Sequence, residues 1–206
     1  MIGFFKKFSV YCSSDGFWNA VRYAFKTLLN LVYVNSTTVF LRCVEPLSAV
    51  SDSVAFKILN DKDEVERLDF PRLKMLDCDG KLRDGHRLYV GFVNGKPVSY
   101  SWTAMGSYHI LYVGSFELGD KEYWIGPTFV LNAFRGRGLN KAGINRQIHD
   151  VDGVCYTSVN SGNKPSLHSF LSLGFEEIGR VKYKKFLCFS SVDIKGSELK
   201  SKMLIQ

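Results

Sequence analysis

One stretch, residues 123–175, constrains the fold of this chain more than any other. It alternates strands and helices: the predicted strands are 123–131 and 153–159, and the predicted helices are 138–149 and 164–173. The glycine-rich turn Arg135-Gly136-Arg137-Gly138 joins the first strand to the first helix. Such an alternation requires a sheet with helices packed on its faces.

The region before this stretch reads as an antiparallel meander. Its predicted strands are 87–93, 97–104 and 108–118. Asn94-Gly95 joins the first two, and this dipeptide favours a two-residue hairpin turn in which both residues have positive φ. We therefore predict an α/β (α+β) fold with a mixed, mostly antiparallel central sheet flanked by helices.

The flanking segments are predicted as additions to a domain over residues 51–190. That domain starts with a strand over 51–59, a helix capped by Asn60-Asp61 and a polar loop over 77–85. It ends with a hairpin of strands over 175–181 and 183–189. Residues 1–50 are predicted as an N-terminal extension of one amphipathic helix and a strand over 36–43. Residues 191–206 are predicted as a loose polar tail.

The N-terminal helix has two interpretations. Aromatic and aliphatic residues recur at helical spacing through 15–33, after Ser13, Ser14 and Asp15 as candidate caps. We favour a helix packed on the domain core, because aromatic helix faces are usually buried. The alternative is a basic amphipathic helix, with Arg22 and Lys26 on one side, that lies on a membrane or on a partner.

Charge and cysteine content narrow the class of protein. The 206 residues carry a net charge of +7, which favours an anionic partner. No basic stripe with interleaved aromatics occurs, so nucleic acid is not expected as that partner. Five scattered cysteines without a CxxC pair indicate reduced thiols, and the four histidines lack metal-ligand spacing, so we expect no metal. With no apolar run long enough to span a bilayer, we predict a cytoplasmic protein, at the inner face of the membrane if the helix over 15–33 lies on lipid.

The turn at 135–138 has the chemistry of an anion site. Glycines let backbone N–H groups approach a ligand, and the start of a helix adds unsatisfied N–H groups and a positive partial charge. We predict a phosphate site made by Arg135, Gly136, Arg137, Gly138, Leu139, Asn140 and Lys141. It is not a Walker A loop, since the GK[ST] ending is missing, nor a Rossmann fingerprint, since Lys141 stands where the third glycine belongs.

A second polar element follows at a fixed distance. Asn163 and Phe170 are seven residues apart, with Ser166 between them, so they share one face of the helix over 164–173. Asn at the start of a helix is commonly a cap. Because this helix comes one strand after the anion turn, the two elements together predict a site for an extended phosphorylated ligand.

These residues resemble the GNAT superfamily of N-acyltransferases. Arg135, Gly138 and Asn140 fall on its [QR]-x-x-G-x-[GA] pattern, with Asn140 in place of the usual small residue. A second family pattern, Asn-x-x-[AS]-x-x-x-[YF]-x-x-x-G-F, is matched by Asn163, Ser166, Phe170, Gly174 and Phe175. The resemblance covers about residues 85–190, and it implies a sheet splayed between its fourth and fifth core strands, 123–131 and 153–159.

The resemblance also implies a ligand and an activity. The ligand is acetyl-CoA or another acyl-CoA, with its pyrophosphate on the N–H groups of 135–141. Its pantetheine arm would pair with the main chain of Thr128, Phe129 and Val130, and Asn163, Ser166 and Phe170 would face it. The implied activity is transfer of the acetyl group to a primary amine by a monomer or homodimer.

The acceptor amine is open. A small molecule such as an amino sugar is one candidate, because the whole-chain layout is similar to GNAT proteins of cell-envelope polysaccharide pathways. The alternatives are acetylation of a protein lysine or N-terminus, and a non-catalytic acyl-CoA-binding module.

Acyl transfer to an amine needs a base, an oxyanion donor and an acid for the leaving thiolate. The family resemblance assigns the oxyanion donor to the backbone N–H of Val130. Phe170 stands where many relatives carry a tyrosine acid, and Ser158 where some carry a glutamate base. Replacement candidates for the acid and base are Tyr156, Glu117 and Tyr123, with Glu122 and His109 as further options. No covalent enzyme intermediate is needed, so Cys155 is predicted to be a buried apolar residue.

Overall fold

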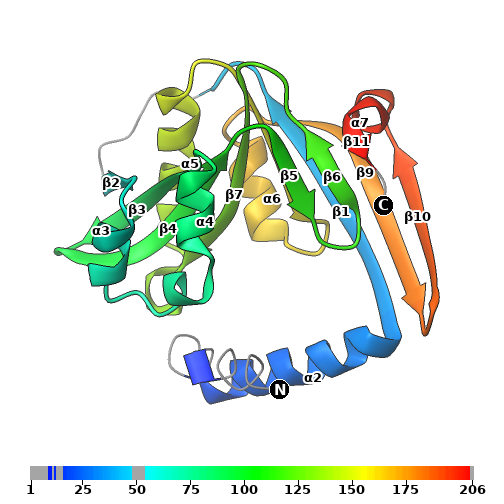
Figure 1. Cartoon of the computed structure of the whole chain (residues 1–206), viewed down its shortest axis with the longest axis horizontal. Helices are drawn as coiled ribbons and strands as arrows, with labels where there is room; N and C mark the ends of the chain where they lie inside the picture. The colour runs from blue at the N-terminus through cyan, green and yellow to red at the C-terminus, as the bar shows by residue number, and fades with distance from the viewer. Residues whose placement is uncertain (1–8, 11, 13–15, 48–53, 205–206) are drawn as a thin grey trace.

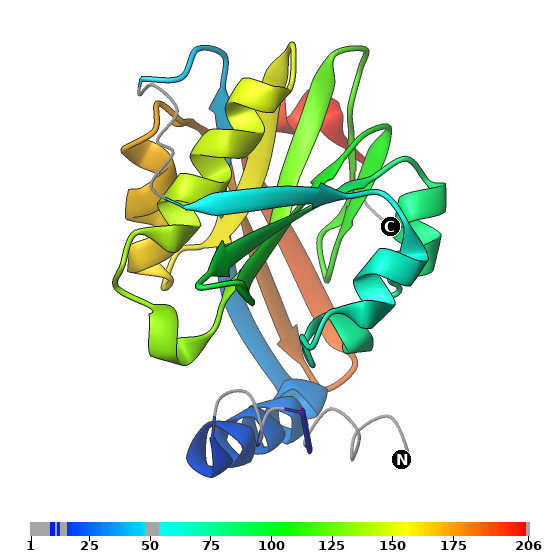
Figure 2. The same cartoon turned by 90° about the vertical axis from the view of Figure 1, so that its left-hand side faces the viewer.

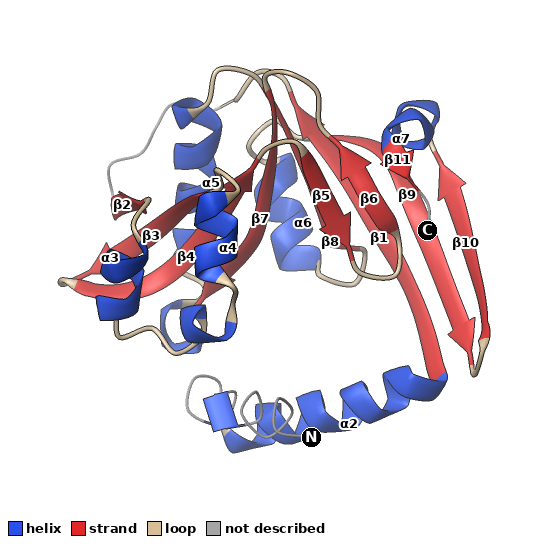
Figure 3. Ribbon diagram, in the orientation of Figure 1, coloured by secondary structure: helices blue, strands red, loops and turns tan. Residues whose placement is uncertain are grey.

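The computed structural model describes residues 9–10, 12, 16–47 and 54–204 of the chain. Figures 1 and 3 show a large twisted sheet with helices on its faces and one long helix, α2, beside the body. The helices are α2 (Phe17–Val32), α3 (Lys62–Arg67), α4 (Cys78–Arg83), α5 (Leu139–Asp150), α6 (Lys164–Leu171) and α7 (Ser197–Lys202), with 3₁₀ turns η1 (Leu73–Met75) and η2 (Asn132–Phe134). The strands are β1 (Tyr33–Cys43), β2 (Ala55–Leu59), β3 (Arg87–Val93), β4 (Lys96–Ala104), β5 (Ser107–Ile110), β6 (Gly114–Glu117), β7 (Glu122–Val130), β8 (Val154–Asn160), β9 (Glu176–Phe186), β10 (Phe189–Lys195) and β11 (Met203–Leu204).

Eight strands form the main sheet in the order β10-β9-β1-β8-β7-β4-β3-β2. All neighbouring pairs are antiparallel except β7 and β8, which run parallel, so the predicted mixed, mostly antiparallel sheet is confirmed. The parallel pair arises because β7 and β8 are joined by the helix α5, which crosses over one face of the sheet. A smaller sheet has the order β11-β6-β5.

The two faces of the main sheet are covered by different elements. On one face, α5 and α6 contribute Ile144, Ile148 and Phe170 to a core with Ile125 of β7 and Val159 of β8. The other face is covered by α7 and the small sheet, whose core residues include Phe40, Phe116, Trp124, Tyr156 and Leu199. In the central strands β1, β7 and β8, alternate residues thus point into these two apolar layers, as the period of a strand requires.

Several local predictions are confirmed. β3 and β4 form the predicted hairpin, and Asn94 and Gly95 have φ values of 51° and 73°. The Asp61 side chain caps α3 by accepting a hydrogen bond from the N–H of Asp63 at 2.9 Å. The strands and helices predicted over 123–173 are present as β7, α5, β8 and α6.

Other local predictions are wrong. The single strand predicted over 108–118 is the hairpin β5–β6, which turns where Tyr112 has a φ of 67°. The predicted loop over 77–85 contains the helix α4, capped by the side chain of Asp77. The two strands predicted over 175–189 are one long strand, β9.

The prediction of a loose tail after residue 190 is also wrong. β10 pairs with β9 through Lys195, and α7 and β11 follow it. Leu199 of α7 is fully buried in the core, and Met203 of β11 pairs with Phe116 of β6. The polar composition of this segment reflects exposed strand faces and not disorder.

The N-terminal region is not an appendage to the sheet. β1 lies in its interior, pairing with β8 on one side and with β9 on the other. The preferred interpretation of the preceding helix is wrong, because in α2 only Ala20 is buried while Trp18 is 75% exposed. The observed N-cap of α2 is Gly16, and the predicted caps at 13–15 lie outside the described residues. Within the described part of the chain, no helix has the length and apolar character needed to cross a bilayer.

Candidate functional site

The site is organised by the separation of β7 from β8. These strands pair only between Glu122–Trp124 of β7 and Val154–Tyr156 of β8. Just beyond the paired residues, the hydroxyl of Thr157 donates a hydrogen bond to the carbonyl of Ile125 at 2.8 Å. After that point β7 remains paired with β4 but not with β8, so its edge from Gly126 to Val130 is open. The splay predicted between these two strands is confirmed.

Two cavities lie along this opening. The loop cavity, of about 500 Å³, is lined by Thr128, Phe129, Val130, Phe134, Arg135, Gly136, Gly138, Leu139, Asn140, Lys141, Asn163, Pro165, Ser166 and Ser169. The hairpin cavity, of about 420 Å³, is bounded by the β5–β6 hairpin, the 124–128 segment of β7 and the 157–160 segment of β8. Thr128, Asn163 and Ser166 line both, so the two cavities meet at the splay.

The glycine-rich turn has the backbone that an anion site needs. Gly136 and Gly138 both have φ of +76°, a conformation that L residues with a side chain rarely adopt. The first α5 hydrogen bond recorded at this end runs from the N–H of Ala142 to the carbonyl of Gly138. The amides of residues 139–141 precede it and therefore have no intrahelical acceptor. They border the loop cavity at the positive end of the α5 dipole.

The basic residues of the turn have different positions. The Nε of Arg135 donates to the carbonyl of Val130 at 3.0 Å, and its guanidinium lies 5.7 Å from the centre of the Phe129 ring. Arg135 thereby ties the turn to the end of β7. Lys141 lines the loop cavity, whereas Arg137 lies over the ring of Phe134 and is not among the lining residues.

The helix α6 brings the second predicted element to the same place. Asn163 is its N-cap, accepting a hydrogen bond from the N–H of Ser166 at 3.4 Å. That cap occupies the amide oxygen, so the amide nitrogen is the group of Asn163 that can donate to a ligand. Phe170 is 2% exposed, packs edge-on against Phe175 and borders the hairpin cavity.

The hairpin cavity holds polar groups that the sequence did not single out. Its lining includes Tyr108, whose ring stacks on Trp124 with centroids 4.7 Å apart. Burial raises the pKa of the Tyr108 hydroxyl, so this phenol keeps its proton at neutral pH. His109, an option from the sequence, and Ser158 also line this cavity. Tyr108 was missed because residues 108–118 looked like one continuous strand. The sign of a break in the sequence was the glycine at position 114, which has a φ of +124° in the structure.

The acid and base candidates Tyr156, Glu117 and Tyr123 are not among the residues that line either cavity. Tyr156 is 3% exposed in the core on the opposite face, where burial and the neighbouring Glu122 raise the pKa of its hydroxyl. Glu117 is exposed on β6, and Tyr123 packs against the core beneath α5 and α6. Val130 does line the loop cavity, and its role as an oxyanion donor stays a prediction.

Glu122 is held in a polar cluster away from the cavities. Its carboxylate accepts hydrogen bonds from the Lys202 ammonium at 2.6 Å, the Gly119 N–H at 2.6 Å and the Tyr156 hydroxyl at 3.2 Å. Burial alone would raise the pKa of Glu122, but these donors together outweigh it and lower the pKa. A carboxylate held in its ionised form by three donors is a poor proton acceptor.

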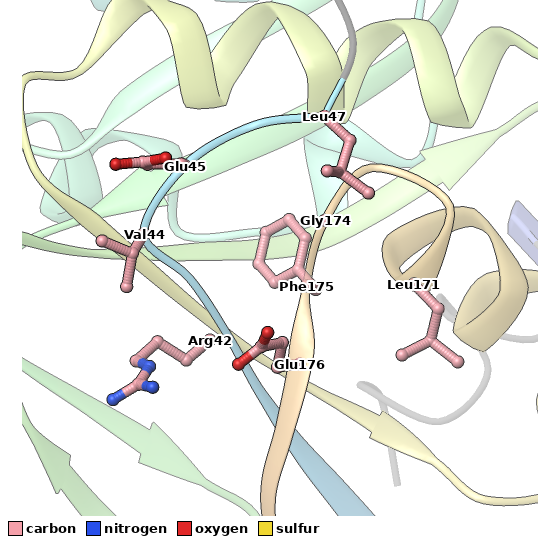
Figure 4. Close-up of a pocket in the computed structure, with 8 residues that line it drawn as sticks. All are labelled: Arg42, Val44, Glu45, Leu47, Leu171, Gly174, Phe175 and Glu176. Carbon is pink, nitrogen blue, oxygen red and sulfur yellow. The ribbon is translucent and has the colours of Figure 1, made fainter.

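Cys155 is 1% exposed, and burial together with the nearby Cys43 raises the pKa of its thiol to about 12. It is therefore a protonated core residue and not a nucleophile. A further cavity, of about 420 Å³, lies where β1 ends beside the α6–β9 turn (Figure 4). It is lined by Arg42, Val44, Glu45, Leu47, Leu171, Gly174, Phe175 and Glu176, none of which lines the splay.

No protein-family model and no curated protein matches the chain. Solved structures do match. An acetyltransferase from the GNAT family of Colwellia psychrerythraea aligns with a TM-score of 0.54 at 11% identity, over 79% of this chain and 61% of that one. A GNAT-family protein from Novosphingobium aromaticivorans aligns with a TM-score of 0.53 at 15% identity, over 80% of this chain and 66% of that one.

A conserved protein of unknown function from Staphylococcus epidermidis gives a TM-score of 0.52 at 15% identity, over 78% of this chain and 64% of that one. The chain thus spans about two thirds or less of the length of these structures. At such low identity the likeness concerns the backbone and not the substrate. It agrees with the mixed, mostly antiparallel sheet flanked by helices, and the chain has the GNAT fold.

Proposed function

We propose that the chain is an N-acetyltransferase that moves an acetyl group from acetyl-CoA to a primary amine of a small molecule. One observation carries this proposal: the loop cavity and the hairpin cavity meet at the splay between β7 and β8. A long phosphorylated donor can therefore lie on one side of the sheet opening and an acceptor can enter from the other. The GNAT fold adds general support for acetyl transfer.

The residues of the loop cavity fit the donor. The free amides of 139–141 and the Lys141 ammonium suit a pyrophosphate, and the open edge of β7 offers main-chain groups to the amides of a pantetheine arm. Asn163 lies where the arm would pass from one cavity to the other. Acetyl-CoA supplies the activated acetyl group, as a thioester, and the protein supplies its position.

The residues of the hairpin cavity fit proton transfer. His109 is exposed there, and its imidazole can accept the proton of an incoming ammonium. Tyr108 remains protonated and can donate to a departing thiolate. The volume of about 420 Å³ suits a small acceptor, such as an amino sugar, better than a folded protein surface.

A non-catalytic acyl-CoA-binding module is the second candidate. Phe170 has no hydroxyl and Ser158 no carboxylate, and the described lining of the hairpin cavity contains no acidic residue. This composition leaves Tyr108 and His109 as the groups on which turnover would depend.

Thiol release from acetyl-CoA, measured with a panel of small primary amines, separates the candidates. We expect amine-dependent release that is lost in the double variant Tyr108→Phe/His109→Gln while CoA binding is kept. Tight CoA binding without release for any amine would favour the binding module. Absence of CoA binding, measured by calorimetry on the folded protein, would overturn both candidates.

A further inference from the structure

The apolar side of α2 faces solvent. Seven of its residues are largely exposed: Phe17 (59%), Trp18 (75%), Phe25 (64%), Leu28 (59%), Leu29 (51%), Leu31 (66%) and Val32 (46%). At 100° per residue these side chains occupy one half of the helix, and Asn19, Arg22, Lys26 and Asn30 occupy the other. Among the described residues, this amphipathic helix of 16 residues therefore has no layer covering its apolar side.

The apolar surface continues onto the β9–β10 turn. Phe186, Leu187 and Phe189 are 60%, 53% and 75% exposed. The N–H of Leu187 donates to the carbonyl of Val32 at 2.7 Å, and Phe186 pairs with Tyr33. The end of α2 and this turn thus meet, as Figure 1 shows at the lower right. We name residues 17–33 and 182–189 the arm.

The arm is strongly basic. Arg22, Lys26, Lys182, Lys184 and Lys185 lie in it, and neither 16–41 nor 181–192 contains an acidic residue. The arm therefore has a net charge of +5, against a net charge of +7 for the whole chain. An apolar helix face with aromatic residues and an opposite basic face is the pattern of helices that lie in a lipid–water interface. Trp18 and Tyr33 are the residue types that concentrate at that depth.

The charge argues against a second copy of the chain as the occupant. A second copy of the chain would cover the apolar side but would not neutralise the five cations, because it carries the same set. An anionic bilayer complements both properties at once, because acyl chains accept the apolar side and headgroups attract the cations.

The position of the arm orients it relative to the site. Thr38 of β1 pairs with Asn160, the last residue of β8, and β1 extends five further residues to Tyr33, paired only with β9. At about 3.3 Å per residue the arm projects roughly 16 Å beyond β8. It projects from the end of the sheet at which β7 and β8 are separated, and in Figures 1 and 2 α2 runs beneath that end.

We propose that the arm binds anionic membrane surfaces, with α2 lying in the interface and the open end of the splay facing the lipid. The inference is independent of the acetyl transfer proposed above, since it concerns binding alone. It predicts that phosphatidylserine-containing vesicles bind the full chain and that vesicles of phosphatidylcholine alone bind it far more weakly.

Tryptophan fluorescence is a direct readout. Trp102 and Trp124 are 0% and 2% exposed, so a change of polarity on binding reports on Trp18. Titration with vesicles of phosphatidylcholine containing 30 mol% phosphatidylserine should shift the emission to the blue, and added salt should reverse the shift. Trp18→Phe should remove the shift while the protein still sediments with the vesicles.

Matched variants test the two components of the surface. Phe25→Gln/Leu28→Gln should weaken vesicle binding by roughly tenfold or more. Lys184→Glu/Lys185→Glu should weaken it by about fivefold for each cation removed, or more. Leu204→Gln changes an exposed leucine of β11, outside the arm, and should bind as the unchanged protein does.

Two outcomes would overturn the proposal. One is equal binding of the unchanged protein and Phe25→Gln/Leu28→Gln to anionic vesicles. The other is a dimer, seen by light scattering, that the same double variant converts to a monomer while vesicles bind neither form. We expect each variant to fold, because the substituted side chains are on the surface. Circular dichroism checks this.

Discussion

The hydroxyl of Tyr156 donates a hydrogen bond to Oε1 of Glu122 at 3.2 Å, on the side of the sheet opposite α5 and α6. The ring of Tyr156 also lies under the Lys202 ammonium, 5.0 Å from its centroid. This phenol is committed to a structural cluster, while Tyr108 presents its ring at the hairpin cavity. We therefore expect substitution by phenylalanine to affect mainly stability at Tyr156 and mainly catalysis at Tyr108.

Tyr156→Phe should leave the acetyl transfer rate within about twofold and lower the free energy of unfolding by about 1 kcal/mol, the usual net value of one hydrogen bond. Tyr108→Phe should lower kcat by roughly a hundredfold with little change in stability, since general acids contribute about that factor. Steady-state kinetics and urea unfolding of both variants check this. A larger loss of kcat in Tyr156→Phe than in Tyr108→Phe would contradict the assignment.

Gly138→Asp should weaken CoA binding by roughly tenfold or more, because a carboxylate within about 5 Å of a phosphate repels it by a few kcal/mol at an effective dielectric constant near 20. The positive φ of Gly138 adds a strain of about 1–2 kcal/mol, which lowers Tm by a few degrees. Gly95→Asp is the matched control, because Gly95 has a similar φ of +73° and lies in the β3–β4 turn. Calorimetric titration with CoA should distinguish the two variants. Equal affinities would contradict the assignment of residues 135–141 as the phosphate site.

Asn163 caps the N-terminus of α6 and also lines both cavities. Two substitutions separate these two roles. Asn163→Asp keeps an oxygen for the N–H of Ser166 but replaces the amide donor with a negative charge, so stability should hold while CoA affinity falls. Asn163→Ala should lose about 1 kcal/mol of stability through the missing cap. Thermal unfolding and CoA titration of both variants test this. If both lose affinity only in proportion to stability, Asn163 is a cap alone.

Glu122 should contribute to acid sensitivity. Its pKa is lower in the folded protein than the ordinary value of 4.5, so its stabilisation is fully present above that value and is lost as pH falls through the folded-state pKa. Glu122→Gln should therefore be less stable than the unchanged protein at pH 7, and the difference should shrink between about pH 5 and pH 3. Urea unfolding across this range measures the difference, with Glu117→Gln, at an exposed position of β6, as the control. A difference that stays constant with pH would show that the lost packing, not the charge, matters.

The features that the sequence predicted correctly are mainly turns and helix caps, which depend on residues adjacent in the chain. The Asn94-Gly95 turn, the Asp61 cap and the Gly136 and Gly138 turn each follow from the backbone preferences of a few adjacent residues. The splay was instead implied by the resemblance to the GNAT superfamily that the two motifs carry. The structure has all of these features.

The main feature that the sequence did not predict, the position of β1 in the sheet, depends on contacts between segments far apart in the chain. Nothing near Val39 or Leu41 indicates that β1 inserts between β8 and β9, because strand pairing partners are not encoded in local periodicity. Gly80 within α4 weakened the helical pattern of 78–83. The hairpin β5–β6 was hidden by an apolar run, so Tyr108 could not be placed at the cavity from the sequence.

Because β1 lies inside the sheet, it cannot form its strand pairs until later parts of the chain have been synthesised. β1 leaves the ribosome early, yet both of its sheet partners, β8 and β9, lie in the last third of the chain. At about 5–20 residues per second, its apolar residues wait several seconds before β8 exists to pair with them. The pairing of β1 therefore waits for the last third of the chain. A fragment that begins at residue 51 would retain both motifs but would lack the strand that joins β8 to β9.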